Sequence, residues 1–203
     1  MRVLRIFENN INDRYIQEAV EELRNGNIVI YPTDSLYALA VDAMNKKAVE
    51  RLCRLKGLNP EKNLLSIVCA DLSQASDYVK LDNNAFAVLK EYLPGPYTFV
   101  LPSSTRLPKI YKARKTVGLR IPDNKIARAL AAAMGNPLLT GSVEVDTDNP
   151  EASVEPENLA VTYGGDVSVV IDGGTGGTGL STIVDLTDSS SPEVIRAGIG
   201  DFE

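Results

Sequence analysis

The stretch Ile28-Val-Ile-Tyr31, followed by Pro32-Thr-Asp-Ser-Leu-Tyr-Ala-Leu39, decides how the fold begins. A run of apolar residues that a proline stops predicts a short buried strand, because proline cannot donate to the hydrogen-bond ladder of a sheet. The residues before this strand predict an amphipathic helix that Asp13 caps and Gly26 ends. A helix that leads directly into a buried strand is typical of α/β proteins.

The same alternation continues along the chain. A second helical pattern precedes Gly57, and further helices are predicted over residues 84–92 and 123–134. Strand patterns follow at 64–70, 97–101, 116–121, 137–142, 167–171, 182–186 and 194–196. The close spacing of the last strands favours antiparallel pairing, so we expect a mixed sheet. No linker rich in proline, serine or glycine divides the chain, and we expect one α/β domain over residues 1–203.

Charge is distributed unevenly over the chain. Residues 1–143 carry 20 basic and 14 acidic side chains, whereas residues 144–203 carry 1 basic and 13 acidic ones, within an overall charge of −6. Two basic stretches stand out, Lys46 to Lys62 and Arg106 to Arg120. They are either solvated helix faces or an anion-binding surface.

Several classes of protein are excluded or disfavoured. The chain has no histidine, so Ser/His/Asp triads, Cys/His nucleophiles and His-Glu-x-x-His zinc sites cannot be built. Cys53 and Cys69 lie in apolar surroundings without a CxxC pattern and are expected to be core residues. No signal peptide and no stretch of roughly 18 apolar residues is present, and we expect a cytoplasmic protein without membrane contact.

A glycine-rich run, Gly173 to Gly179, contains a literal GxGxxG pattern. It does not predict a dinucleotide site, because such a loop must open a helix, whereas this loop leads into the strand pattern at Ser181 to Asp185. It is either a flexible turn or a loop whose backbone amides and Ser181 and Thr182 hydroxyls face a phosphate.

A set of short segments in fixed order carries a stronger signal. The segments are Tyr31-Pro-Thr-Asp-Ser-Leu-Tyr-Ala-Leu39, Leu55-Lys-Gly57, Leu93-Pro-Gly-Pro-Tyr-Thr-Phe-Val-Leu101, Val117-Gly-Leu-Arg-Ile-Pro122, Pro137-Leu-Leu-Thr-Gly-Ser142, Leu180-Ser-Thr-Ile-Val-Asp185 and Arg196-Ala-Gly198. Together they resemble the YrdC/YciO family over nearly the whole chain. The sequence Pro-Thr-Asp-Ser resembles the YciO branch of that family. The resemblance implies a YrdC-like fold: a twisted, mostly mixed or antiparallel sheet with helices around a large, positively lined cavity.

The resemblance also implies an activity. Catalytic members of the family are threonylcarbamoyl-AMP synthases, which join L-threonine, bicarbonate and ATP, with Mg²⁺ accompanying the ATP, and release pyrophosphate in the pathway of a tRNA modification. Such a reaction needs positioning and charge neutralisation more than proton carriers, so the lack of histidine is compatible with it. No protein side chains are identified as metal ligands, and no protein partner is implied.

Binding residues follow from the motif positions. The resemblance assigns substrate or nucleotide binding to Thr33, Lys56, Arg120, Ser142, Ser181 and Arg196, with Thr182 as a further hydroxyl and Tyr37 as a cavity wall or stacking surface. The arginines would bind phosphate or carboxylate oxygens, and Lys56 would add a positive charge. Surface ion pairs for the arginines and plain packing for Tyr37 are the alternatives.

Two positions depart from the synthase pattern. Leu58 stands where synthases carry an arginine two residues after the lysine, and Glu144 stands where they carry an asparagine two residues after the serine. Leu58 removes a positive charge and Glu144 adds a negative charge near the expected polyphosphate. Both changes are therefore expected to weaken ATP binding. Three functions therefore stay open: a weak or altered synthase, a module that binds tRNA or double-stranded RNA, and a nucleotide-binding regulator without turnover.

Overall fold

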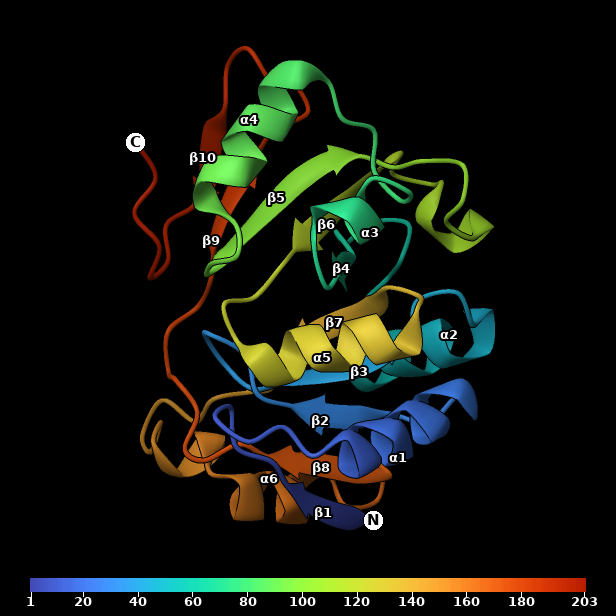
Figure 1. Ribbon diagram of the computed structural model, residues 1–203, viewed down its shortest axis with the longest axis vertical. Coiled ribbons are helices and arrows are strands. Elements are labelled where there is room, and N and C mark those ends of the chain that lie inside the picture. The colour runs from blue at the N-terminus through green and yellow to red at the C-terminus, as the bar shows by residue number, and fades with distance from the viewer.

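Ten strands join into one twisted sheet in the computed structural model, which describes residues 1–203 (Figure 1). The strands are β1 (Arg2–Arg5), β2 (Val29–Tyr31), β3 (Ala38–Asp42), β4 (Ser66–Val68), β5 (Tyr97–Pro102), β6 (Thr116–Arg120), β7 (Leu138–Ser142), β8 (Val169–Asp172), β9 (Thr182–Asp185) and β10 (Glu193–Arg196). The helices are α1 (Asp13–Arg24), α2 (Lys46–Leu55), α3 (Leu72–Ala75), α4 (Asn83–Tyr92), α5 (Lys125–Met134) and α6 (Pro156–Tyr163).

The strand order is β1-β8-β2-β3-β7-β4-β6-β5-β9-β10. Five of the neighbouring pairs are antiparallel and four are parallel, so the predicted mixed sheet is confirmed. The N-terminus lies at the β1 edge, and the C-terminal residues run beside β9 and β10 at the other edge (Figure 1).

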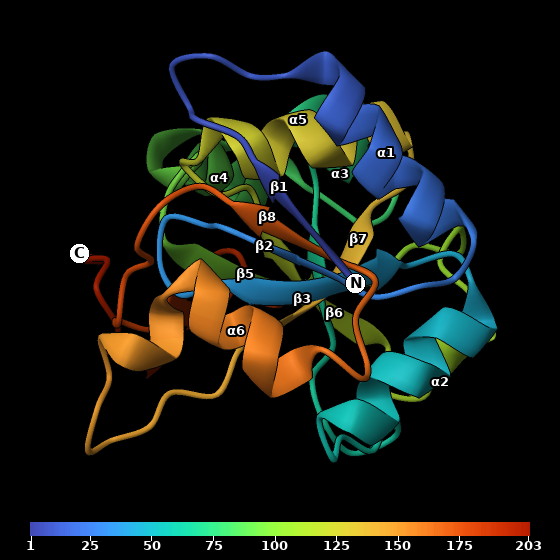
Figure 2. The same ribbon diagram turned by 90° about the horizontal axis from the view of Figure 1, so that it is seen from below.

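Helices cover both faces of the sheet. Seen from below, α1 and α5 lie on one face and α2 and α6 on the opposite face (Figure 2). Because side chains alternate along a strand, successive residues of β3 enter different cores: Ala38 and Ala40 pack with α1 and α5, whereas Leu39 and Val41 pack with α2 and α6. The two cores explain why β2 and β3 are apolar at every position except the last residue of β3.

The sequence predictions need three corrections. Asn12, and not Asp13, caps α1, because its side-chain oxygen accepts a hydrogen bond from the Tyr15 amide at 3.3 Å. The strands β1 and β3 and the helix α6 were not expected. Of the last strands, only β9 and β10 pair in the antiparallel direction that was predicted. The strand β8 instead pairs in parallel with β1 and β2. The glycine-rich loop then connects β8 to β9, which lies in the other half of the sheet.

Two further expectations concern the interior and the membrane. Cys53 and Cys69 are free thiols and both are buried, as expected of core residues. None of the helices has the combination of length and apolarity that a membrane crossing requires.

Candidate functional site

A cavity of about 360 Å³ opens where β4, β5, β6, β7 and β9 lie side by side. Its lining is Lys56, Leu58, Leu64, Ser66, Thr98, Arg120, Thr140, Gly141, Ser142, Val143, Leu180, Ser181, Ile183 and Arg196. Five of the predicted binding residues, namely Lys56, Arg120, Ser142, Ser181 and Arg196, are therefore brought together. Lys56 directly follows α2, and Ser181 directly precedes β9. The other three are the last residues of β6, β7 and β10.

Hydroxyl groups that the sequence analysis missed line the same cavity. Ser66, Thr98 and Thr140 lie on three different strands, and each is next to an apolar residue that is buried in the core. Gly118 separates Ser66 from Thr98, and a Cβ atom at position 118 would lie 2.6 Å from Ser66 Oγ and 2.8 Å from Thr98 Cγ2. The only signal in the sequence for Ser66 and Thr98 is a polar residue within a mostly apolar strand, and Thr140 shares β7 with the predicted Ser142.

Arg120 is the most deeply buried cation of the site. It is 4% exposed, and its Nη2 donates to Asp34 Oδ1 at 2.9 Å and to Ser35 Oγ at 3.0 Å. The other Asp34 oxygen accepts the Asp123 amide at 2.7 Å. Burial raises the pKa of Asp34 above its usual value, although the charge of Arg120 opposes that shift. The Nε of Arg120 is buried without any hydrogen-bond partner.

Arg196 lines the cavity from β10, the edge strand that pairs with β9. Its Nη2 donates to the Ser181 carbonyl at 2.7 Å, and its Nε is also buried without a partner. Burial, and then the positive charge of Arg120, lower the pKa of Arg196. An unsatisfied buried donor costs about 1–3 kcal/mol, and an anionic group is the kind of ligand that could accept hydrogen bonds from these two guanidinium groups and offset their repulsion.

Of the two departures from the synthase pattern, Leu58 lines this cavity, whereas Glu144 lies outside the lining and pairs with the lining residue Lys56. Lys56 is only 14% exposed, and its ammonium pairs with the carboxylate of Glu144 at 3.4 Å, while Glu144 itself is 80% exposed. The cation predicted to bind a ligand is therefore already paired with a carboxylate.

Two of the predicted hydroxyls lie outside the cavity lining. Thr33 Oγ1 donates to the Leu36 carbonyl at 2.6 Å and accepts the Ser35 amide at 3.0 Å. Thr182 Oγ1 donates to the Gly200 carbonyl at 2.5 Å. Both hydroxyls are buried and support turns beside the site, because their strand or turn positions point them into the backbone rather than into the cavity.

Tyr37 does not form a wall of this cavity either. It is buried, and its hydroxyl donates to the Gly174 carbonyl at 2.7 Å and accepts the Gly173 amide at 3.0 Å. The glycine-rich loop leads into a strand, as expected, and packs against this tyrosine. A Cβ atom at Gly176 would lie 2.5 Å from the Tyr37 ring, and one at Gly177 would lie 2.6 Å from the Ser35 carbonyl. Close packing therefore accounts for glycine at these two positions.

The chain resembles known proteins over nearly its full length. The family model Sua5_yciO_yrdC, described as telomere recombination, matches residues 21–198. YciO, an uncharacterized protein of Escherichia coli strain K12, is 39% identical over 200 residues, which are 98% of this chain and 96% of YciO. The crystal structure of E. coli YciO superposes with a TM-score of 0.87 at 37% identity and covers 98% of this chain and 96% of its own.

Proteins with a named activity are also similar. The threonylcarbamoyl-AMP synthase of Halorhodospira halophila is 33% identical over 183 residues, which are 89% of this chain and 93% of that protein. The crystal structure of Pyrococcus abyssi Sua5 complexed with L-threonine gives a TM-score of 0.84 at 29% identity; the match covers 97% of this chain and 57% of Sua5.

Proposed function

The chain belongs to the Sua5/YciO/YrdC family, and we propose that its cavity binds ATP and L-threonine and joins them with bicarbonate into threonylcarbamoyl-AMP. Relatives named threonylcarbamoyl-AMP synthase, and a Sua5 structure complexed with L-threonine, support the substrate classes. The observation that carries the proposal is the pair of buried Nε donors of Arg120 and Arg196, which lack partners beside one polar cavity.

The residues of the cavity fit this chemistry. The threonine amine and bicarbonate combine into a carbamate with loss of water, and a carbamate oxygen then attacks the α-phosphorus as pyrophosphate leaves. Arg120 and Arg196 neutralise an anionic group of the substrates, and the Ser142 and Ser181 hydroxyls donate to their oxygens. Holding the reactants in line supplies most of the catalysis, so histidine is not needed.

Magnesium is proposed to arrive with ATP. No group of three or more His, Cys, Asp or Glu side chains is arranged to hold a metal ion. The carboxylates of Asp34 and Glu144 are paired with Arg120 and Lys56. We therefore propose that the phosphate oxygens of ATP are the main ligands of the ion.

The test is pyrophosphate release from ATP in the presence of Mg²⁺ and bicarbonate, measured with and without L-threonine. We expect release that depends on L-threonine, because the carbamate is the nucleophile. Omission of bicarbonate should remove the same activity. Release that is equal with and without L-threonine would point to hydrolysis of ATP to AMP and pyrophosphate, and no release under any of these conditions would exclude the synthase proposal.

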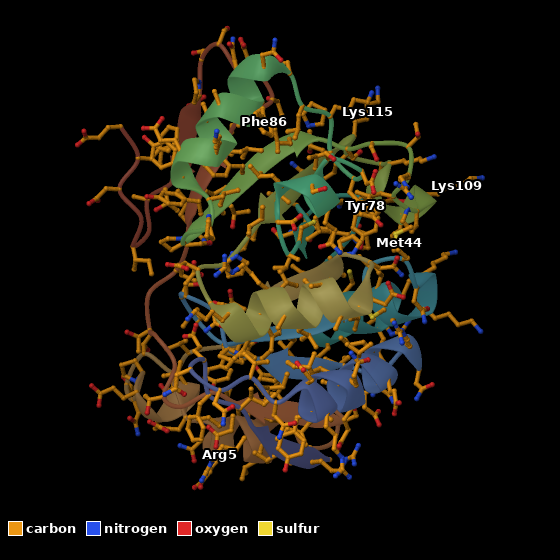
Figure 3. The ribbon with its side chains drawn as sticks, viewed as in Figure 1. Arg5, Met44, Tyr78, Phe86, Lys109 and Lys115 are labelled. Atoms are coloured by element: carbon orange, nitrogen blue, oxygen red, sulfur yellow. The ribbon has the colours of Figure 1, made fainter.

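We propose RNA binding as a second candidate function, on the basis of a separate basic surface. A hollow of about 490 Å³ is lined by Lys80, Pro102, Ser103, Ser104, Thr105, Lys112 and Lys115. Its three lysines are exposed and none pairs with a carboxylate. Figure 3 shows Lys109 and Lys115 extending outward from the loop that joins β5 and β6. Hydroxyls and unpaired ammonium groups suit a phosphodiester backbone.

The salt dependence of binding tests this candidate. A Lys80→Gln, Lys112→Gln variant should bind a short RNA duplex more weakly, and the slope of log affinity against log salt concentration should fall by about 2. The matched control, Lys90→Gln with Lys125→Gln, removes the same charge from exposed positions elsewhere and should leave the slope unchanged. Equal slopes for the two variants would refute binding at this hollow.

A further inference from the structure

The charges around the cavity suit a ligand with one phosphoryl group better than a triphosphate. We propose that the site binds an adenylate in preference to ATP and that Glu144 is the residue that discriminates between them. This inference rests on the proposed function, because it takes a nucleotide to be the ligand.

Carboxylates already neutralise two of the three cations at the cavity. Arg120 pairs with Asp34 at 2.9 Å, and Lys56 pairs with Glu144 at 3.4 Å. Arg196 donates only to serine oxygens and has no carboxylate partner. The formal charge of these five side chains is therefore +1, which is far from balancing the four negative charges that ATP carries without a metal ion.

The free hydrogen-bond donors point to the same ligand class. The unpaired Nε atoms belong to Arg120 and Arg196, and both arginines line the same cavity. One tetrahedral anionic group can accept hydrogen bonds from both. The two arginines can therefore bind one phosphoryl group. A second and a third phosphoryl group would find no cation that is free of a carboxylate partner.

The wall around Lys56 opposes a polyphosphate chain. Leu58 and Leu64 line the cavity beside this lysine and offer no hydrogen-bond donor from their side chains. The carboxylate of Glu144 is mostly exposed and is held near the cavity by Lys56. A triphosphate that reaches Lys56 must displace this carboxylate and then lie close to its negative charge, whereas a monophosphate bound between the arginines need not.

Titration calorimetry without added metal tests the inference with AMP and ATP as probes. The wild-type protein should bind AMP more tightly than ATP. Glu144→Gln keeps the shape of the side chain and removes its charge, so the affinity for ATP should rise about tenfold, while the affinity for AMP should change less than about threefold. Glu144 is exposed, so this substitution should not impair folding.

Glu21→Gln is the matched control, because Glu21 is an exposed residue of α1 that forms no ion pair. It should leave both affinities unchanged. Tighter binding of ATP than AMP by the wild type, or an unchanged ratio in Glu144→Gln, would overturn the inference. If the same preparations still release pyrophosphate in response to L-threonine, only this inference fails and the proposed function stands. Absence of binding by either nucleotide would overturn this inference, and the proposed function would fall with it only if L-threonine-dependent pyrophosphate release in the presence of Mg²⁺ were absent as well.

Discussion

Replacing Arg120 with alanine is expected to lower kcat/KM for threonine-dependent pyrophosphate release about 100-fold, the usual effect of losing a buried donor that faces developing or transferred negative charge. It also leaves the buried Asp34 without its partner, and removal of one member of a buried ion pair destabilises a protein by about 3–5 kcal/mol. Pyrophosphate assays and urea unfolding measure the two effects.

A double variant separates the two roles of Arg120. In Asp34→Asn with Arg120→Gln, both charges of the buried pair are removed together, and the asparagine oxygen can still accept the Asp123 amide. We expect most of the free energy of unfolding to return while activity stays low. Recovery of both would mean that Arg120 serves only to neutralise Asp34 and does not bind the substrate.

Phe99→Ala is expected to lower the free energy of unfolding by about 3–5 kcal/mol, because it removes a large side chain from the core. Phe99 is 0% exposed. Its ring lies 5.9 Å from that of Tyr97, 6.1 Å from that of Phe202 and 6.4 Å from that of Tyr92, so alanine leaves a large cavity in an aromatic cluster. The neighbouring Thr98 lines the candidate site, and loss of this packing should also weaken ligand binding.

The matched control is Phe86→Ala; Phe86 lies on α4 (Figure 3) and the residue is exposed. The same change of side chain there should cost less than about 1 kcal/mol, because little apolar surface is removed from the interior. Urea unfolding of both variants gives the comparison. Similar decreases in the free energy of unfolding for the two variants would contradict the assignment of Phe99 to the core.

Much of the fold could be predicted from local patterns. Amphipathic periods identified α2, α4 and α5, and apolar runs that end at proline identified β2 and β6. The strand β3 was missed because Ala38 to Asp42 is buried on both faces and shows no alternation. The helix α6 was missed because it is short and its apolar Val161 lies off the face that buries Leu159, Ala160 and Tyr163.

The candidate site was predictable only where the family resemblance supplied it. Arg120 and Lys56 lie at motif positions, and the structure brings both to one cavity. Ser66 could be identified as a site residue only from the register of the sheet. This register places it opposite Thr140 in one neighbouring strand and opposite Gly118 in the other. The pairing of Asp34 with Arg120 joins residues that are far apart in the chain, and no local pattern reveals it.

The central claim is that an anionic group of the substrates binds between Arg120 and Arg196. A crystal structure of the protein grown with L-threonine and a non-hydrolysable ATP analogue tests it most directly. We predict density for a phosphate or carboxylate group within hydrogen-bond distance of the Nε atoms of both arginines. Ligand density elsewhere on the protein, with both Nε atoms still unpaired, would contradict the proposed site.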